Sequence, residues 1–466
     1  MAKLGTESNP LRVAIIGSGP TGFYTAEHLF KQKDLIVEID MYDRLPTPFG
    51  LVRGGVAPDH PKIKSVTAVY HRTAQNPRFR FYGYVEFGQD VHLEDLRAHY
   101  HQIVYTTGAQ TDRRMGIPGE DLQGSHPATE FVAWYNGHPD FRDLQFDLSQ
   151  ERAAVVGIGN VAMDVARILC RTPEELAKTD IADYALEALS RSKVKEVVVL
   201  GRRGPAQAAF TNPEIKEMGE LADADVFTLP EEVELDELSR AALESNPDRA
   251  TQKKVGILQS YARNKPSGKS RKLTIRFLVS PVELIGDEAG RVVGMRLVRN
   301  VLYATEAGTL RPKHTDQFEE HPVGLVFRSV GYRGVPLPGV PFHESWGVIL
   351  NEKGRVIDPE SQSPVTGEYT AGWIKRGPSG VIGTNKPDAL ETVNCMLEDL
   401  AAGQTLNPAH PEIEAAEKLV RQRQPNYISY QDWLRLDELE VARGQELGRP
   451  RLKFTRIEDM LAALGR

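Results

Sequence analysis

Short apolar runs, each followed by a glycine-rich turn, set the pattern of this chain. The first run, Val13–Ile16, is typical of a buried strand because every residue in it is apolar. The turn Gly17–Gly22 follows, and apolar residues then recur at helical spacing at Phe23, Ala26, Leu29 and Phe30. Leu35–Tyr42 supplies the next strand. The pattern predicts a strand–turn–helix–strand unit near the start of the chain.

A second unit of the same kind begins at Ala153. The run Ala153–Val156 predicts a strand, Gly157–Ala162 a turn, and the apolar positions that follow predict a helix. Val197–Leu200 is the second strand of this unit. The interval between its elements is longer than in the first unit, so residues 172–191 predict an additional helix.

A strand that ends at a glycine, at residues 103–108, has an echo at Leu325–Ser329, which leads to Gly331. We interpret the echo as the return of the chain to its first domain, so that the second domain is inserted between about residue 111 and about residue 328. Residues 231–248 are acid-rich and predict a solvated helix. The segment 409–466 alternates charged and apolar residues and predicts helices.

Both glycine turns have the context of a dinucleotide fingerprint, in which glycines let the backbone approach a pyrophosphate at a helix N-terminus. The first leads to Asp43 at the end of the next strand, and an acid there suits a free ribose diol. Arg44 follows, but Asp43 would repel a 2′-phosphate. The second leads to Arg202 and Arg203, whose planar guanidiniums suit a 2′-phosphate. The chain is therefore expected to hold two different dinucleotides, the second being NADP(H).

The composition excludes several other classes. At 466 residues, two or three domains are expected, and the net charge of −7 gives no support to nucleic-acid binding. The only two cysteines, Cys170 and Cys395, lie far apart, which argues against a Cys-x-x-Cys redox pair, a cysteine-ligated iron–sulfur cluster or a zinc ribbon. No metal site is expected. No apolar run reaches the ~18 residues of a membrane span, and no targeting segment is evident, so we expect a cytoplasmic protein.

Five longer strings resemble the adrenodoxin-reductase-type ferredoxin–NADP⁺ reductases. They are PFGLVRGGVAPDHP (48–61), FVAWYNG (131–137), GIGNVAMDVARIL (157–169), VVLGRRGPAQAAFT (198–211) and AGWIKRGPSGVIGT (371–384). The resemblance implies an α/β fold of glutathione-reductase type, with two Rossmann-like domains, the second inserted in the first. It implies an FAD-binding domain at 1–110 and 329–405, an NADP-binding domain at 111–328 and a helical C-terminal extension at 406–466.

The resemblance also implies site residues. The expected FAD contacts are Gly17, Gly19, Pro20, Thr21, Gly22, Asp43, Leu51, Val85, Trp373, Gly380, Val381 and Ile382. The expected NADP contacts are Ile158, Gly159, Asn160, Val161, Arg202, Arg203, Glu214 and Gly380. The candidate catalytic residues are His60, which lies near the flavin edge in the family, and Glu214. Without the resemblance, His60 would be interpreted as a loop histidine and Glu214 as a solvated acid on a helix.

The implied activity is that of an FAD-dependent ferredoxin–NADP⁺ reductase. Hydride passes between NADPH and FAD, and single electrons pass to or from an acidic iron–sulfur protein. The basic run from Lys253 and Lys254 to Arg276, which contains no acid, is the candidate docking surface for ferredoxin, against the alternative of a solvated segment. Alternatives are the electron-input subunit of a larger complex, a thiol-disulfide reductase, which the cysteines oppose, and a non-catalytic scaffold that contains FAD.

Overall fold

The computed structural model describes residues 3–466, which divide into two compact units. The first unit consists of residues up to 56, 60–111 and 331–466, and the second of residues 57–59 and 112–330. The chain thus leaves the first unit after residue 111 and returns to it at residue 331. The domain boundaries expected from the sequence lie at 110 and 329.

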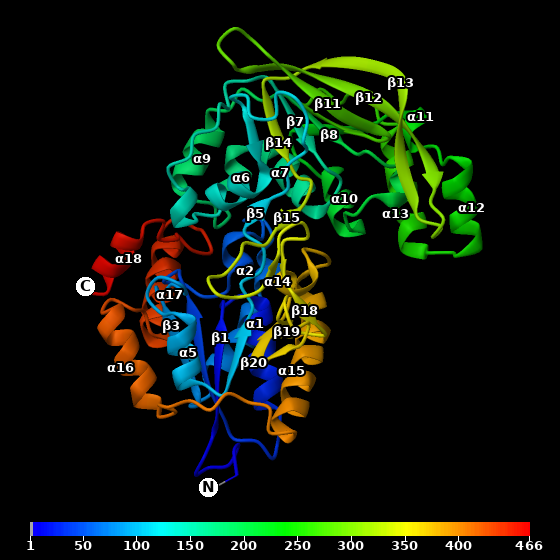
Figure 1. Ribbon diagram of the computed structural model, residues 1–466. Helices are drawn as coiled ribbons and strands as arrows, with labels where there is room; N and C mark the ends of the chain where they lie inside the picture. Colours follow the sequence, from blue (N-terminus) through cyan, green and yellow to red (C-terminus); the bar gives the residue numbers. More distant parts are fainter. Residues whose placement is uncertain (1–2) are drawn as a thin grey trace. The chain divides into compact units, whose positions relative to one another are not determined.

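A seven-stranded sheet forms the centre of the first unit, in the order β18-β19-β20-β4-β1-β2-β3 (Figure 1). The strands are β1 (Leu11–Ile16), β2 (Val37–Asp43), β3 (Phe79–Gly83), β4 (Gln102–Tyr105), β18 (Asn351–Glu352), β19 (Arg355–Ile357) and β20 (Pro364–Thr370). From β20 to β3 all neighbours are parallel, whereas β18 and β19 add antiparallel pairs at one edge. Such parallel strands are covered on both faces, which explains their apolar runs.

Helix α1 (Pro20–Phe30) connects β1 to β2, as the sequence pattern predicts, and packs against α15 (Asn385–Ala401). Pro20 is favourable at the first helical position because its missing N–H would have no partner there. The apolar face of α1 is fully buried at Phe23, Ala26 and Leu29. The shorter helices of this unit are α2 (Leu51–Gly54), α3 (Pro61–Lys64), α4 (Thr67–Ala74), α5 (Leu93–His99) and α14 (Trp373–Arg376).

The end of the chain is helical, which confirms the prediction for residues 409–466. Helices α16 (Ile413–Arg423), α17 (Tyr430–Glu446) and α18 (Ile457–Ala463) lie on the β3 side of the first sheet, shown in orange and red in Figure 1. The backbones of Ile428 and Gly83 exchange hydrogen bonds of 2.7 and 2.8 Å, which joins this segment to β3. The C-terminal helices therefore belong to the first unit.

The second unit contains a six-stranded sheet in the order β6-β14-β7-β8-β10-β9, in which every neighbouring pair is parallel. The strands are β6 (Ser125–Pro127), β7 (Arg152–Val156), β8 (Glu196–Leu200), β9 (Ala224–Thr228), β10 (Arg271–Arg276) and β14 (Leu325–Arg328). The predicted strands 153–156 and 197–200 are confirmed as β7 and β8. The strand that echoes residues 103–108 is β14, which comes last among these strands along the chain. The chain leaves the second unit just after it.

The helices of the second unit lie between its strands along the chain. They are α6 (Ala128–Tyr135), α7 (Asn160–Cys170), α8 (Pro173–Leu176), α9 (Asp183–Ser190), α10 (Asn212–Met218), α11 (Pro230–Val233), α12 (Glu237–Ser245) and α13 (Arg249–Tyr261). The single helix expected over residues 172–191 is in fact two helices, α8 and α9. The acid-rich segment is only partly solvated, because Glu232 is fully buried and pairs with Arg276 at 2.8 Å.

A separate antiparallel sheet extends the second unit. It consists of β11 (Val279–Gly286), β12 (Val292–Ala304) and β13 (Leu310–Pro322). The α/β fold, with two sheets built mainly of parallel strands and a helical C-terminal part, confirms the fold class expected from the sequence. Within the described residues, no helix has the length and apolar character needed to cross a membrane.

Candidate functional site

The first glycine turn forms an open cradle between β1 and α1. Gly17 has a φ of +108°, and a Cβ there would lie 2.7 Å from the carbonyl oxygen of Thr106. A Cβ at Gly22 would overlap the carbonyl oxygen of Gly17. Gly19, in contrast, has no atom within 4 Å of its Cβ position. Gly17 and Gly22 thus permit the tight turn, while Gly19 leaves space in front of the helix N-terminus, where a phosphate binds favourably.

Asp43 lies at the end of β2 and is directed at this cradle. Its Oδ2 accepts hydrogen bonds from the backbone N and the hydroxyl of Ser18, at 3.0 and 2.5 Å. Its Oδ1 accepts a bond from the backbone N of Leu45 at 2.9 Å. The carboxylate therefore also stabilises the glycine turn itself. Its contact with a ribose diol stays a prediction.

Thr107, which the sequence reasoning missed, lies beside the same cradle. Its backbone N would be 3.0 Å from a Cβ at Gly17. Its hydroxyl oxygen is buried and has no hydrogen-bond partner within residues 3–466. Because buried polar atoms are nearly always bonded, this hydroxyl suits a polar group of a bound ligand. The strand-then-glycine string YTTG was the available signal, since ligands bind at the carboxyl ends of parallel strands.

The apolar residues expected at the flavin differ in exposure. Leu51 at the start of α2 is 37% exposed and Val381 is 52% exposed, so both present apolar surface that a flat apolar ligand would cover. Val85 is buried, and its backbone N donates to the carbonyl oxygen of Asp43 at 2.9 Å. Gly380 is exposed with a φ of +79°. Ile382 begins a 3₁₀ turn (Ile382–Thr384) that leads into α15.

Trp373 begins the short helix α14, directly after the buried Gly372. Gly372 has a φ of +80°, and a Cβ there would overlap the side chain of Thr21 in the first fingerprint. The Trp373 indole N–H donates to the carbonyl oxygen of Ser379 at 3.2 Å, and its ring lies 5.5 Å from that of Tyr332. The backbone around Trp373 therefore reaches the cradle of the first glycine turn.

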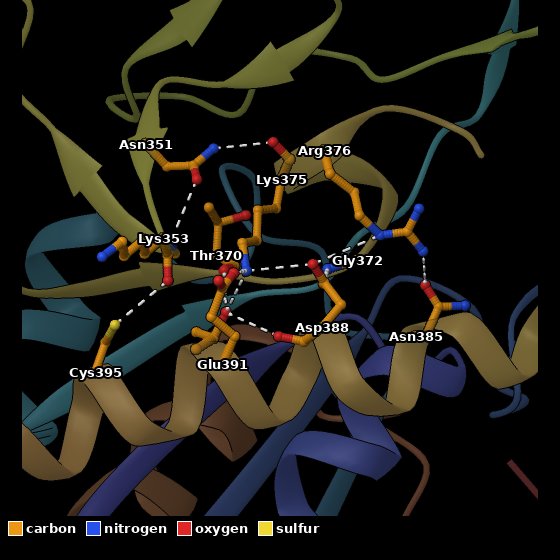
Figure 2. A network of polar contacts seen from close by, with 12 residues as sticks. Asn351, Lys353, Thr370, Gly372, Lys375, Arg376, Asn385, Asp388, Glu391 and Cys395 are labelled. Carbon is orange, nitrogen blue, oxygen red and sulfur yellow. Dashed lines mark hydrogen bonds and ion pairs between the residues drawn. The ribbon is translucent and has the colours of Figure 1, made fainter. Parts of the chain in front are cut away.

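Figure 2 shows the polar network that supports this segment from helix α15. Asp388 accepts a hydrogen bond from the backbone N of Gly372 at 2.5 Å and lies 3.2 Å from the Lys375 ammonium. The Lys375 side chain is only 6% exposed, and its ammonium also contacts Glu391 at 2.6 Å. Arg376 donates to the side-chain oxygen of Asn385 at 2.9 Å. A buried cation and its acids thus fix the backbone of α14.

The second glycine turn, in the second unit, repeats the first. Gly157 has a φ of +138°, and a Cβ there would overlap the carbonyl oxygen of Ser329. Gly159 has no atom within 4 Å of its Cβ position, so it is the open position of this cradle. The side chain of Asn160 accepts a bond from the backbone N of Thr211 at 2.9 Å. Ile158 and Val161 pack against the core of this unit.

Arg202 and Arg203 follow strand β8 at the same end of the sheet. Arg202 is exposed and Arg203 is partly buried. Burial, together with the neighbouring Arg202 cation, lowers the pKa of Arg203. Among the described ion pairs, neither guanidinium has an acidic partner. Two adjacent cations without a counter-charge form a site that an anion such as a 2′-phosphate would stabilise.

Asn300 on β12 supports the arginine loop and was not foreseen from the sequence. It is 2% exposed, and its amide donates to the carbonyl oxygen of Arg202 and to the hydroxyl of Ser280, each at 2.8 Å. The backbone N of Asn300 donates to the carbonyl oxygen of Leu278. The backbone N of Leu278 in turn donates to the carbonyl oxygen of Arg203. The antiparallel sheet thereby holds the loop in place. No local pattern connects residue 300 with residue 202.

Glu214 lies in the first turn of α10 and is buried, unlike the solvated acid that its residue type alone favours. Its carboxylate is 3.3 Å from the guanidinium of Arg167, a fully buried residue on α7. Arg167 also pairs with Asp59 and Asp164, each at 2.7 Å. Burial alone would lower the pKa of Arg167, but these acids outweigh it and raise that pKa. Glu214 thus belongs to a charged cluster within the second unit.

His60 belongs to the first unit, where it precedes helix α3. Its side chain is 9% exposed. The sequence alone favours a loop histidine, and the structure places it in a loop but largely buried. Its catalytic role stays a prediction.

Two sheets built mainly of parallel strands, each with a glycine cradle at the carboxyl end of an inner strand, are typical of an oxidoreductase of the two-dinucleotide class. Residues 11–218 match the family described as pyridine nucleotide-disulphide oxidoreductase. The structure is similar to that of Mycobacterium tuberculosis FprA in complex with NADPH, with a TM-score of 0.91, 43% identity, and coverage of 98% of this chain and 100% of that chain.

Known sequences narrow the class. The chain is 44% identical to the NADPH-ferredoxin reductase FprA of Mycobacterium tuberculosis, over 97% of this chain and 98% of that protein. It is 41% identical to the mitochondrial NADPH:adrenodoxin oxidoreductase of Homo sapiens, over 99% of this chain and 93% of that protein. The chain belongs to the adrenodoxin-reductase-type ferredoxin–NADP⁺ reductase family.

Proposed function

We propose that this protein is an FAD-dependent ferredoxin–NADP⁺ reductase. The observation that carries the proposal is the unequal chemistry of its two cradles. The first has Asp43 beside its glycine turn, and the second has the adjacent cations Arg202 and Arg203. An acid suits FAD and an arginine pair suits NADP(H), so one chain has a site for each.

The residues of the first unit fit FAD. Gly19 leaves room for the pyrophosphate, and Leu51 and Val381 expose apolar surface. Thr107 offers a buried hydroxyl that has no hydrogen-bond partner among the described residues. When bound, FAD supplies hydride transfer with NADPH and single-electron transfer with an iron–sulfur partner. The protein contributes orientation: Gly17–Gly22 bind the phosphates, Asp43 the ribose, and Trp373 and Gly380–Ile382 border the flavin.

The second unit would bind NADPH through its own cradle. Ile158–Val161 present backbone N–H groups to the pyrophosphate at the N-terminus of α7. Arg202 and Arg203 bind the 2′-phosphate and select NADPH over NADH. Glu214, which the buried Arg167 holds in place, orients the nicotinamide end.

His60 is the second candidate for a catalytic role, as a group that controls proton access near the flavin. No nucleophile or metal is required for this chemistry, because the cofactors perform it.

The partner would be a ferredoxin that docks on part of the basic run. Lys254 is not free for this, because its ammonium donates to the carbonyl oxygen of Ala208 at 2.6 Å, and burial lowers its pKa. Lys253, Arg263 and Lys265 are exposed and remain suitable. An acidic partner would be attracted to these charges even though the chain is acidic overall.

Anaerobic titration with NADPH tests the proposal. Loss of the visible flavin absorption, followed by cytochrome c reduction only when ferredoxin is added, would support it. A flavin that NADPH leaves oxidised would favour the non-catalytic scaffold. Electron transfer that requires further subunits would favour the electron-input subunit.

Charge reversal tests the docking surface separately. Lys253→Glu with Lys265→Glu should raise KM for ferredoxin at low salt and leave KM for NADPH unchanged. An unchanged KM for ferredoxin would exclude this surface.

Cys170 and Cys395 are buried free thiols, which agrees with the expected cytoplasmic location; that location stays a prediction.

A further inference from the structure

The turn formed by residues 49–53 covers the first glycine cradle. Phe49 has a φ of +86°, which is strained for a residue with a side chain, and its backbone N donates to the carbonyl oxygen of Ser18 at 2.9 Å. Gly50 follows with a φ of +49°, and a Cβ there would be 3.0 Å from the Cα of Gly19. The position of this turn therefore determines the space in front of the cradle. A strained turn keeps such a position only if its surroundings hold it.

A buried ion pair holds the end of this turn. Arg53 donates to both carboxylate oxygens of Glu440 on α17, at 2.8 and 2.5 Å. Glu440 is 0% exposed and also accepts bonds from Arg451 at 3.1 Å and from the backbone N of Phe454 at 2.8 Å. Burial alone would raise the pKa of Glu440, but Arg53 and Arg451 outweigh it and lower that pKa. The surroundings therefore favour the charged form of the carboxylate, and each of its oxygens accepts two hydrogen bonds.

Other C-terminal residues contact the same turn. The Arg53 guanidinium lies over the Trp433 ring, 5.1 Å from its centroid. Trp433 also packs edge-on against Phe49, with ring centroids 5.8 Å apart. The ammonium of Lys453 donates to the carbonyl oxygen of Arg53 at 3.3 Å. Both the side chains and the backbone of the turn thus have partners from the end of the chain.

The segment 449–454 that supplies these partners is itself fixed on α17. The backbone N of Leu452 donates to the carbonyl oxygen of Glu440 at 2.8 Å. A Cβ at Gly444 would overlap the backbone of Arg451, so only glycine allows this close return. Helix α17 and residues 449–454, called the C-terminal clamp below, form one packed element.

We propose that the C-terminal clamp is part of the FAD site: through the pair between Glu440 and Arg53, it holds turn 49–53 against the glycine cradle and so retains the cofactor. This deepens the proposed function and rests on its assignment of FAD to the first unit. Glu440 is then a positioning residue, because it acts through Arg53. The clamp gives residues 430–454 a role in cofactor binding beyond covering the sheet.

The test is the rate of FAD release from the purified full-length holoprotein, followed by the rise in flavin fluorescence after dilution. Glu440→Gln should accelerate release at least about tenfold, because removing one partner of a buried pair leaves an uncompensated charge whose cost exceeds that of a tenfold change. The matched control is Glu438→Gln, the same substitution at an exposed position of α17, which should release FAD at the parent rate.

A double-mutant cycle separates positioning from general stability. If the pair acts as a unit, Arg53→Gln with Glu440→Gln should release FAD no more than about twofold faster than the single variants, since their effects are not additive. Arg53→Lys, which keeps the charge but loses the paired bonds, is the milder variant if Glu440→Gln does not fold, and it should also accelerate release.

The outcomes are distinct. Release at the parent rate from Glu440→Gln, or from Arg53→Lys where the former does not fold, would overturn the clamp. So would additive effects in the double variant, or a lower unfolding temperature with unchanged release. A parent protein that contains no FAD would instead refute the proposed function.

Discussion

Replacing Asp388 by alanine removes the acid that fixes the segment before Trp373 (Figure 2). The backbone N–H of Gly372 loses its acceptor, which costs about 1–3 kcal/mol for a buried donor. The Lys375 ammonium loses one of its two acids while remaining only 6% exposed. Breaking a buried pair completely costs about 3–5 kcal/mol, but Glu391 remains as a partner. We therefore expect Asp388→Ala to destabilise the first unit by about 3 kcal/mol.

Two matched variants divide this cost. Asp388→Asn keeps an oxygen for the N–H of Gly372 and removes only the charge, so it should cost about 1–2 kcal/mol. Glu391→Gln removes the other acid, whose side chain is 52% exposed. Solvent already screens that pair, so its loss should cost less than about 1 kcal/mol. The expected order of cost is Asp388→Ala, Asp388→Asn, Glu391→Gln.

Urea unfolding followed by flavin fluorescence measures these costs, because release of FAD reports on the first unit. Far-UV circular dichroism on the same samples reports on both units, so a single two-state transition is not assumed. An unchanged urea midpoint for Asp388→Ala would refute the reasoning. A larger shift for Glu391→Gln than for Asp388→Ala would refute the order, and with it the importance of burial in this network.

Three further outcomes follow from the structure. Arg202→Ala and Arg203→Ala should each raise KM for NADPH about tenfold or more and leave KM for NADH nearly unchanged, as steady-state kinetics with both nucleotides will measure. Gly159→Ala should fold but bind NADP⁺ weakly in a calorimetric titration, because its Cβ position is open, whereas Gly157→Ala should be destabilised through its overlap with the backbone. Burial and the nearby Arg12 lower the pKa of His101 to about 4, so the unfolded chain takes up a proton near pH 6.5 and the folded chain only near pH 4. Stability should therefore fall as the pH falls through this window, by about 2 kcal/mol at pH 5, as denaturant midpoints will measure.

Each of these outcomes has its control. An equal rise in KM for NADH would show that the two arginines do not read the 2′-phosphate. Normal nucleotide binding by Gly159→Ala would place the pyrophosphate elsewhere. The backbone N of Arg12 donates a hydrogen bond to the His101 ring at 3.0 Å. The variant His101→Asn retains an acceptor for this bond but has no titrating group, so it should lose this part of the pH dependence. If the stability of this variant falls between pH 7 and pH 5 as steeply as that of the parent protein, His101 is not the source of the pH dependence.

Local patterns were sufficient for the core of each unit. The strand, glycine turn and helix around Gly17 and around Gly157 were predicted because each depends on neighbouring residues alone. Residues 172–191 were predicted less well, because the break between α8 and α9, at residues 177–182, contains no glycine or proline that would mark it in the sequence. Glu232 was expected in a solvated helix, yet it is buried and forms an ion pair with Arg276. Residue type could not reveal that pairing.

The distribution of distant partners could not be foreseen in the same way. Asn300 supports the backbone of Arg202 from 98 residues away, and Asp388 supports Gly372 from another element. Thr107 became a candidate contact for a bound ligand only because its hydroxyl is buried without a hydrogen-bond partner among the described residues. Each observation requires coordinates, because burial and hydrogen bonding are properties of the packed chain.

The amino-acid sequence alone determined where the two dinucleotide cradles lie and which is acidic and which is basic. Glycine spacing, apolar periodicity and the residues that follow the strands act over a few positions, so they are legible in the chain. Tertiary structure alone decided which distant side chains hold those cradles. Glu440 meets Arg53 across 387 residues because α17 packs beside β3, and apolar periodicity specifies a buried face without naming the partner that covers it.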